Sequence, residues 1–130
     1  MVLPIAKVLV IDDEPDLRRI ARFSLQAVGK WKVTACAGGA EGVEAALRDR
    51  PDVVLLDVSM PGLDGPATLA ALHGQPGLRT VPVLFMTATA SPEARARLVS
   101  LGARGVILKP FDPMGLPGQV IALLAGPGGP

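Results

Sequence analysis

A chain of 130 residues, 49% of them apolar, has room for one domain with a single sizeable core. Its 13 basic and 12 acidic side chains nearly balance, so we expect no direct binding of nucleic acid. The lone cysteine, Cys36, excludes an internal disulfide, and without a secretory signal or an apolar run of about 18 residues we expect a cytoplasmic protein with no membrane contact.

Short apolar runs alternate along the chain with longer segments of helical periodicity. The runs are short, rich in branched residues and bounded by polar residues, which is typical of strands. Strands are therefore predicted at residues 7–11, 31–36, 52–57, 81–88 and 105–109. The run at 53–56 is apolar without interruption, as in a central parallel strand that is buried on both faces.

The periodic segments between these runs are predicted helices. They lie at residues 15–28, 40–50, 65–74 and 91–102, with a further helix near the end of the chain. In the first helix, Pro15 suits the first turn, and Ile20 belongs to the apolar face while Arg18 lies largely away from it. Gly29 is expected to end this helix.

The later helices differ in their end signals. Ser91 is the predicted N-cap of the helix at 91–102, and Leu98 and Leu101 belong to its inner stripe. The last helix has Gly and Pro in its first turn, so we expect it to start only at Pro117.

Five β–α units in succession predict a parallel sheet with helices on both faces and right-handed crossovers. We assign residues 1–125 to this domain and interpret residues 126–130, GPGGP, as a Gly/Pro tail or the stub of a linker. In such sheets the ligand lies beyond the carboxyl ends of the strands, where the strand order reverses.

Polar residues follow four of the five predicted strands. They are Asp12, Asp13 and Glu14 after the first, Asp57 after the third, Thr87 after the fourth and Lys109 after the fifth. Each has a simple structural explanation: Asp13 as a helix cap, Asp57 and Asp64 as turn residues, Thr87 as an ordinary strand residue and Lys109 as a solvated strand end. Together, however, they place acids, a hydroxyl and an amine at one edge of the sheet.

This set of side chains suits phosphoryl transfer. Clustered carboxylates repel one another unless a cation lies among them, and oxygen ligands favour Mg²⁺. A hydroxyl and an amine nearby complete a cradle for a phosphoryl group. A central carboxylate can itself be the nucleophile and form an aspartyl phosphate.

Four motifs in order and spacing carry a resemblance to a known family. They are LVIDDEP, DVVLLDVSMPGLDG, VLFMTATA and LKPF. With them, residues 7–124 resemble the receiver domain of two-component response regulators, and in particular single receivers of the chemotaxis-regulator type. The resemblance implies a flavodoxin-like, doubly wound α/β fold whose five parallel strands have the order 2-1-3-4-5.

The resemblance also implies residue roles. Asp57 would be the phosphoacceptor, and Thr87 and Lys109 would contact the phosphoryl group. Asp12 and Asp13 would bind Mg²⁺ together with Asp57 and the backbone carbonyl of Ser59.

Further roles follow from the same resemblance. Ser59 and Thr89 occupy positions that tune dephosphorylation, and Ala88 is small where the phosphoryl donor approaches. The Lys109–Pro110 peptide bond is expected to be cis. One position departs from the family: Val106 stands where an aromatic ring usually rotates on activation, so we expect a different or reduced switch there.

The functional expectation is a phosphoacceptor and not an enzyme that acts on other substrates. A histidine kinase or phosphotransfer protein would donate the phosphoryl group to Asp57, with Mg²⁺-dependent self-phosphorylation and autodephosphorylation, and the product would switch a protein–protein interaction in a monomer or weak homodimer. Three alternatives remain open: a phosphatase of the haloacid dehalogenase type, for which Ser59 replaces the required second acid; a pseudo-receiver that only binds partners; and the N-terminal receiver of a longer regulator.

Overall fold

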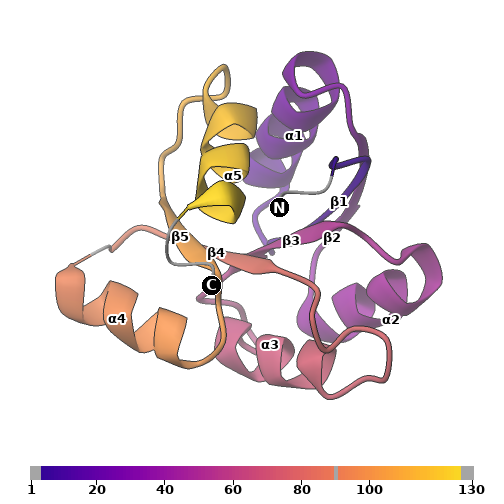
Figure 1. Ribbon diagram of the computed structural model, residues 1–130, viewed down its shortest axis with the longest axis vertical. Helices are drawn as coiled ribbons and strands as arrows, with labels where there is room; N and C mark the ends of the chain where they lie inside the picture. The colour runs from indigo at the N-terminus through magenta and orange to yellow at the C-terminus, as the bar shows by residue number, and fades with distance from the viewer. Residues whose placement is uncertain (1–3, 90, 127–130) are drawn as a thin grey trace.

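The computed structural model describes residues 4–89 and 91–126. Its centre is a parallel sheet of five strands in the order β2-β1-β3-β4-β5 (Figure 1). The strands are β1 (Lys7–Ile11), β2 (Lys32–Cys36), β3 (Val53–Asp57), β4 (Val83–Thr87) and β5 (Gly105–Leu108). The predicted fold and strand order are confirmed.

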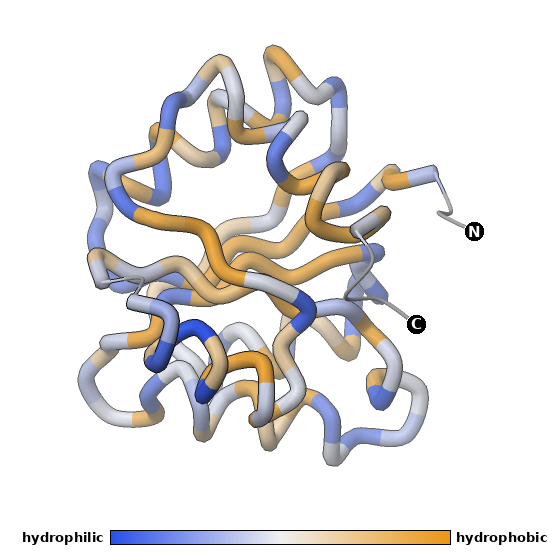
Figure 2. The backbone as a smooth tube through the Cα atoms, turned by 60° about the vertical axis from the view of Figure 1, so that its left-hand side comes forward, coloured by the Kyte–Doolittle hydropathy of each residue, from blue (hydrophilic) through white to orange (hydrophobic). Residues whose placement is uncertain are grey.

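Helices cover both faces of the sheet. They are α1 (Pro15–Phe23), the π-helix η1 (Ser24–Val28), α2 (Gly39–Asp49), α3 (Gly65–His73), α4 (Pro92–Ser100) and α5 (Leu116–Ala125). Figure 1 shows α1 and α5 on one side of the sheet and α2, α3 and α4 on the other. Each side has its own apolar core, and Figure 2 shows the strands between them as the most hydrophobic part of the chain. Among the described residues, no helix is both long and apolar enough to cross a membrane.

The strand β3 is the most deeply buried element of the sheet. All five of its residues are buried, including the terminal Asp57. Burial on both faces explains the uninterrupted apolar run in the sequence. The strand therefore holds Asp57 in a fixed place at the carboxyl edge.

The segment predicted as one helix at 15–28 divides into two. After Phe23 the chain widens into η1, in which the amide of Gly29 donates to the carbonyl of Ser24. The buried hydroxyl of Ser24 donates to the carbonyl of Pro113, which ties this turn to the loop before α5. Ile20, expected on the apolar face, is 44% exposed, because the buried stripe follows Ala21 and Leu25 instead.

The helix α4 is anchored more weakly than was predicted. Ser91 caps it as expected, since its hydroxyl accepts the amide of Ala94 at 3.1 Å. Leu98 is its only buried residue, however, and Leu101 lies beyond the helix end with 48% of its surface exposed. Gly102, with a φ of 115°, turns the chain away directly afterwards, which explains why Leu101 does not extend the inner stripe.

Two other boundaries differ from the sequence prediction. β4 begins at Val83 and not at residue 81, because Pro82 has no amide hydrogen to donate to the neighbouring strand. α5 begins at Leu116, with Pro117 in its first turn, where a missing amide hydrogen costs nothing. Of the predicted tail, Gly126 ends α5, and residues 127–130 lie outside the described residues.

Candidate functional site

Residues at the carboxyl ends of four strands meet at one place. β1 and β3 are paired from Val8 and Val53 onward, so Asp12, which follows β1, and Asp57, the last residue of β3, are brought side by side. The strand order reverses between β1 and β3, which is where ligands bind in sheets of this kind. The ends of β4 and β5 complete the same edge.

Three acids form a compact cluster there. Each of Asp12, Asp13 and Asp57 offers a carboxylate oxygen, and these oxygens lie within 4.8 Å of one another. Asp12 is fully buried and Asp57 is 5% exposed, while Asp13 is half-buried. The Oδ1 atom of Asp12 accepts the amide of Glu14 at 2.9 Å.

The second oxygen of Asp12 distinguishes this cluster from an ordinary surface group of acids. Oδ2 is buried and accepts no hydrogen bond from the described residues, although it lies 3.0 Å from Nζ of Lys109. A buried carboxylate oxygen with free coordination capacity, beside two further carboxylates, is a suitable donor set for a hard divalent cation. The residues present therefore fit Mg²⁺.

Lys109 contacts the cluster from β5. Its Nζ donates to Oδ1 of Asp57 at 3.0 Å and lies 3.6 Å from Oε1 of Glu14. The side chain of Lys109 is only 13% exposed, so it is not the solvated strand end that the sequence also allowed. The peptide bond between Lys109 and Pro110 is cis, as expected.

Burial and charge shift the pKa values of the paired groups. Burial raises the pKa of Asp57 above its ordinary value, and Asp12 adds to this effect, while the hydrogen bond from Lys109 opposes it without cancelling it. Burial alone would lower the pKa of Lys109, but its close contacts with the carboxylates of Asp12 and Asp57 raise it above its usual range. Lys109 therefore stays protonated beside the acids.

A crevice of about 370 Å³ opens over Asp57. Its lining comprises Asp13, Glu14, Asp57, Val58, Ser59, Thr87, Ala88, Thr89 and Lys109. The hydroxyl of Thr87 accepts the amide of Thr89 at 3.1 Å, so the two threonines form one turn at the rim. The structure thus brings together the residues that the sequence singled out at the strand ends, while the Ser59 carbonyl as a metal ligand stays a prediction.

For two acids near the site, Asp13 and Asp64, the structure differs from the simple structural explanations that the sequence allowed. Asp13 does not cap α1, whose N-cap is Glu14 and has no side-chain hydrogen bond. Asp64 is the N-cap of α3, where its Oδ1 accepts the amide of Ala67 at 2.9 Å. Asp13 is thus available for a ligand, whereas Asp64 is already used.

The predicted switch residue is buried under α4. Val106 is 3% exposed and belongs to the core on that side, together with Leu98 and Phe85. A branched aliphatic side chain in this place has no ring to move between an inner and an outer position. Its role in signalling stays a prediction.

Sequence reasoning missed Arg18. This residue was expected to lie away from the sheet, but it is half-buried and its Nη1 donates to the backbone carbonyl of Asp12 at 2.7 Å. The contact fixes the turn that carries Asp12 and Asp13. Helical periodicity could not reveal it, because a long arginine can reach back over the N-terminus of its helix from a partly exposed position.

Known proteins share much of the sequence of this chain. Residues 8–120 match the family model described as the response regulator receiver domain. The chain is 40% identical over 106 residues to the probable transcriptional regulatory protein TcrX of Mycobacterium tuberculosis, covering 81% of this chain and 44% of TcrX. It is 35% identical over 122 residues to the transcriptional activator protein PfeR of Pseudomonas aeruginosa, covering 94% of this chain and 39% of PfeR.

Two solved structures match this chain over nearly their whole solved length. The chemotaxis response regulator CheY4 of Vibrio cholerae superposes with a TM-score of 0.85 at 32% identity, covering 92% of this chain and 99% of CheY4. A putative response regulator from Chloroflexus aurantiacus gives a TM-score of 0.83 at 28% identity, covering 95% and 100% of the two chains. By contrast, the chain spans less than half the length of TcrX and PfeR.

Proposed function

This chain belongs to the response regulator receiver domains of two-component signalling, and on that premise we propose that it accepts a phosphoryl group on Asp57. The observation that carries the proposal is the contact between Nζ of Lys109 and Oδ1 of Asp57 at 3.0 Å, within reach of two further acids. A lone buried acid would either be protonated or lower the stability of the fold. An acid with a fixed cation on one side and two further carboxylates on the other is arranged to bind a metal ion and a phosphoryl group.

The chain's own residues supply nucleophile, orientation and charge. A carboxylate oxygen of Asp57 attacks the phosphorus of the donor, and the rigid strand β3 limits the directions from which it can do so. Lys109 places a positive charge where phosphoryl oxygens gather, and the hydroxyl of Thr87 is available at the rim once it leaves the amide of Thr89. Mg²⁺ held by Asp12, Asp13 and Asp57 would supply further charge neutralisation.

The proposed donor is a histidine kinase or a phosphotransfer protein, and small phosphoryl compounds would serve in its absence. Ser59 and Thr89 line the crevice where water would approach the aspartyl phosphate, so they would set the rate of autodephosphorylation. Ser59 also stands where a dehalogenase-type phosphatase needs an acid. We therefore propose a phosphoacceptor and not an enzyme acting on other phosphoesters.

The proposed output is a change in a protein–protein interaction, made by a cytoplasmic monomer or weak homodimer. The names of the relatives describe a transcriptional activator and a chemotaxis regulator. Because the chain covers less than half of the former and nearly all of the latter, either context would use the same phosphorylated domain.

Intact-mass analysis after incubation with acetyl phosphate tests this function. In the presence of Mg²⁺ we expect one phosphoryl adduct, which is absent in Asp57→Ala and after chelation of the metal. Asp16→Ala is the matched control, because Asp16 is an exposed acid of α1 outside the cluster and its loss should leave the adduct unchanged. A wild-type protein without an adduct, or an Asp57→Ala variant with one, would refute the proposal.

A further inference from the structure

A second cavity adjoins the crevice over Asp57. It has a volume of about 530 Å³ and is lined by Val58, Ser59, Met60, Pro61, Asp64, Pro66 and Arg97. Val58 and Ser59 line both cavities, so the two meet at the turn that follows β3. We call the second cavity the α4 groove, because Arg97 of α4 forms the wall opposite that turn.

The proposed reaction needs space for a leaving group. In phosphoryl transfer the attacking and leaving oxygens lie roughly in line with the phosphorus. The leaving group of the donor must therefore lie on the side of the phosphorus away from Asp57, toward the opening of the crevice, whose lining includes Ser59. A donor larger than acetyl phosphate needs space beyond Ser59, and the α4 groove provides it.

The groove contains one carboxylate, Asp64, and one guanidinium, Arg97. The Oδ1 atom of Asp64 accepts the amide of Ala67 and so caps α3. Within residues 4–89 and 91–126, the guanidinium of Arg97 makes no ion pair or hydrogen bond, so its planar pair of donors is available.

The remaining lining is largely apolar. Met60, Pro61 and Pro66 line the groove together with Ser59 and Arg97. A ligand that reaches both the crevice and Arg97 therefore has a short, partly apolar body between two anionic ends. The groove, with a volume of about 530 Å³, is open to solvent, so it would hold such a ligand at the surface of the protein.

We propose that the α4 groove binds the leaving part of an acyl phosphate that carries a second anionic group, and that Arg97 selects such donors by pairing with that group. The inference rests on the proposed phosphorylation of Asp57. In the reaction, a bond forms between a carboxylate oxygen of Asp57 and phosphorus, and the bond between phosphorus and the acyl oxygen breaks. The acyl group leaves as a carboxylate, so no proton or electron has to be supplied.

Competing donors test the selection. The probes are acetyl phosphate, which lacks a second anion, and 1,3-bisphosphoglycerate, an acyl phosphate with a second phosphate. Time courses of adduct formation at equal Mg²⁺ and ionic strength give the second-order rate constant for each donor. We expect the wild type to prefer 1,3-bisphosphoglycerate by about tenfold, the size of one exposed charge-assisted contact.

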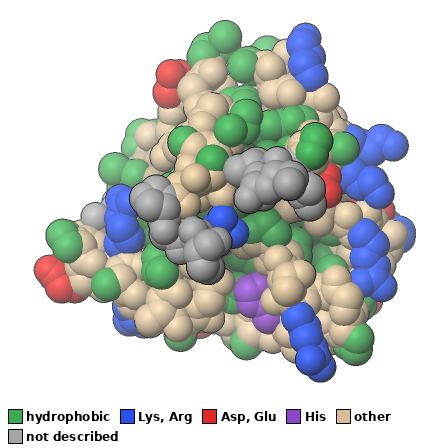
Figure 3. Space-filling view, viewed as in Figure 1, with side chains coloured by type: hydrophobic (Ala, Val, Ile, Leu, Met, Phe, Trp, Pro, Cys, Tyr) green, Lys and Arg blue, Asp and Glu red, His purple; other side chains and the backbone are tan. Residues whose placement is uncertain are grey.

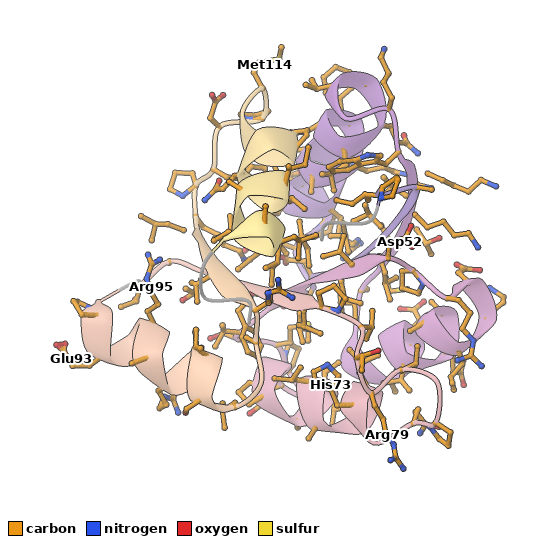
Figure 4. The ribbon with its side chains drawn as sticks, in the orientation of Figure 1. Asp52, His73, Arg79, Glu93, Arg95 and Met114 are labelled. Atoms are coloured by element: carbon orange, nitrogen blue, oxygen red, sulfur yellow. The ribbon has the colours of Figure 1, made fainter. Side chains whose placement is uncertain are left out.

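Variants of α4 assign the preference to one side chain. In Arg97→Met the ratio of the two rate constants should fall by about tenfold from its wild-type value, mainly through a higher KM for 1,3-bisphosphoglycerate, and Arg97→Lys should keep part of the preference because lysine lacks the planar fork. Arg95→Met is the control: Arg95 is an exposed cation of the same helix that does not line the groove (Figure 4). Its ratio should stay at the wild-type value.

The outcomes separate this inference from the proposed function. If neither donor modifies Asp57, the phosphoacceptor function itself is wrong. If both modify it and the ratio of their rate constants is the same in the wild type and in Arg97→Met, Asp57 is the acceptor but the selection by Arg97 is refuted.

Discussion

The two edges of the sheet hold acidic side chains in opposite situations. At the carboxyl edge, Asp12 and Asp57 are buried beside Asp13 and share the cation of Lys109. At the amino edge, Asp52 is exposed, and its Oδ2 accepts the backbone amides of Ala6 at 2.8 Å and Lys7 at 2.9 Å (Figure 4 labels Asp52).

The two edges also differ in how far their charged groups are exposed to solvent. The face shown in Figure 3 carries Lys and Arg side chains near β2 and α2, in open solvent. There, charges satisfy backbone groups and one another without loss of hydration. At the carboxyl edge, charges are gathered out of water, which lowers stability and prepares them for a charged ligand. In this sheet, the exposed Asp52 stabilises the backbone, whereas the buried Asp12 and Asp57 are arranged to bind a charged ligand.

The largest expected effect is on the chemistry of the carboxyl edge. In Lys109→Met the rate of phosphorylation by acetyl phosphate should fall by at least about 100-fold, because a fixed charge beside the transferred group is lost. Methionine can keep the packing of the aliphatic stem. Time-resolved intact mass measures the rate, and Lys32→Met, which removes a cation near the amino edge, should leave it unchanged. Equal rates in Lys109→Met and wild type would contradict the view that the charges of the carboxyl edge assist the reaction.

A smaller effect is expected at the amino edge, on stability alone. Asp52→Ala removes the acceptor of two backbone amides and should lower the free energy of unfolding by about 1–2 kcal/mol. Urea denaturation followed by circular dichroism gives the value. Asp52→Asn retains a neutral acceptor and should lose less, and both variants should be phosphorylated at the wild-type rate.

At the carboxyl edge, removing an acid should raise stability. In the absence of divalent metal, Asp57→Asn should raise the free energy of unfolding by about 1 kcal/mol, because it removes one charge from a crowded, buried group of acids. The same denaturation experiment checks it. Adding Mg²⁺ should stabilise the wild type more than this variant, so a destabilised Asp57→Asn protein without metal would contradict the contrast between the edges.

The smallest expected effect is on the pH dependence of stability. The hydrogen bonds from Arg48 and then Thr34 hold the pKa of Asp49 below its ordinary value. Because the pKa is lowered by folding, Asp49 stabilises the protein above the unfolded pKa of about 3.9, and the gain is lost as the pH falls through the lower folded value.

The measurement for Asp49 is the melting temperature as a function of pH. Asp49→Asn should melt slightly below the wild type at neutral pH, since the pair is exposed and weak. The two curves should converge on the acid side. A difference that widens below pH 4 would contradict the assignment, since that requires a raised pKa.

Much of the fold and of the candidate site was predictable because it follows from local patterns. The apolar run before Asp57 indicated a strand buried on both faces, and parallel strands bring their carboxyl ends to one edge, so Asp12, Thr87 and Lys109 could be placed near it without coordinates. The sequence also correctly located the cap of α4 at Ser91.

The remaining features depend on contacts between distant segments. The turn η1 is tied to Pro113 by Ser24, a bond across 89 positions that helical periodicity cannot anticipate. Arg18 reaches a carbonyl behind its own helix, and Arg97 faces a turn far from it in sequence. Ile20 and Leu101 were misassigned because an apolar residue at helical spacing need not be buried when the helix ends or widens beside it.

The single buried residue of α4 has a consequence for motion. Leu98 alone supplies the burial that fixes this helix, whereas β3 is enclosed along its whole length. Local opening of α4 therefore requires far less free energy than opening of the sheet, and its amides should exchange with solvent well before those of β3. The strand that carries Asp57 and the helix beside it thus belong to different cooperative units, so the domain can rearrange one without displacing the other.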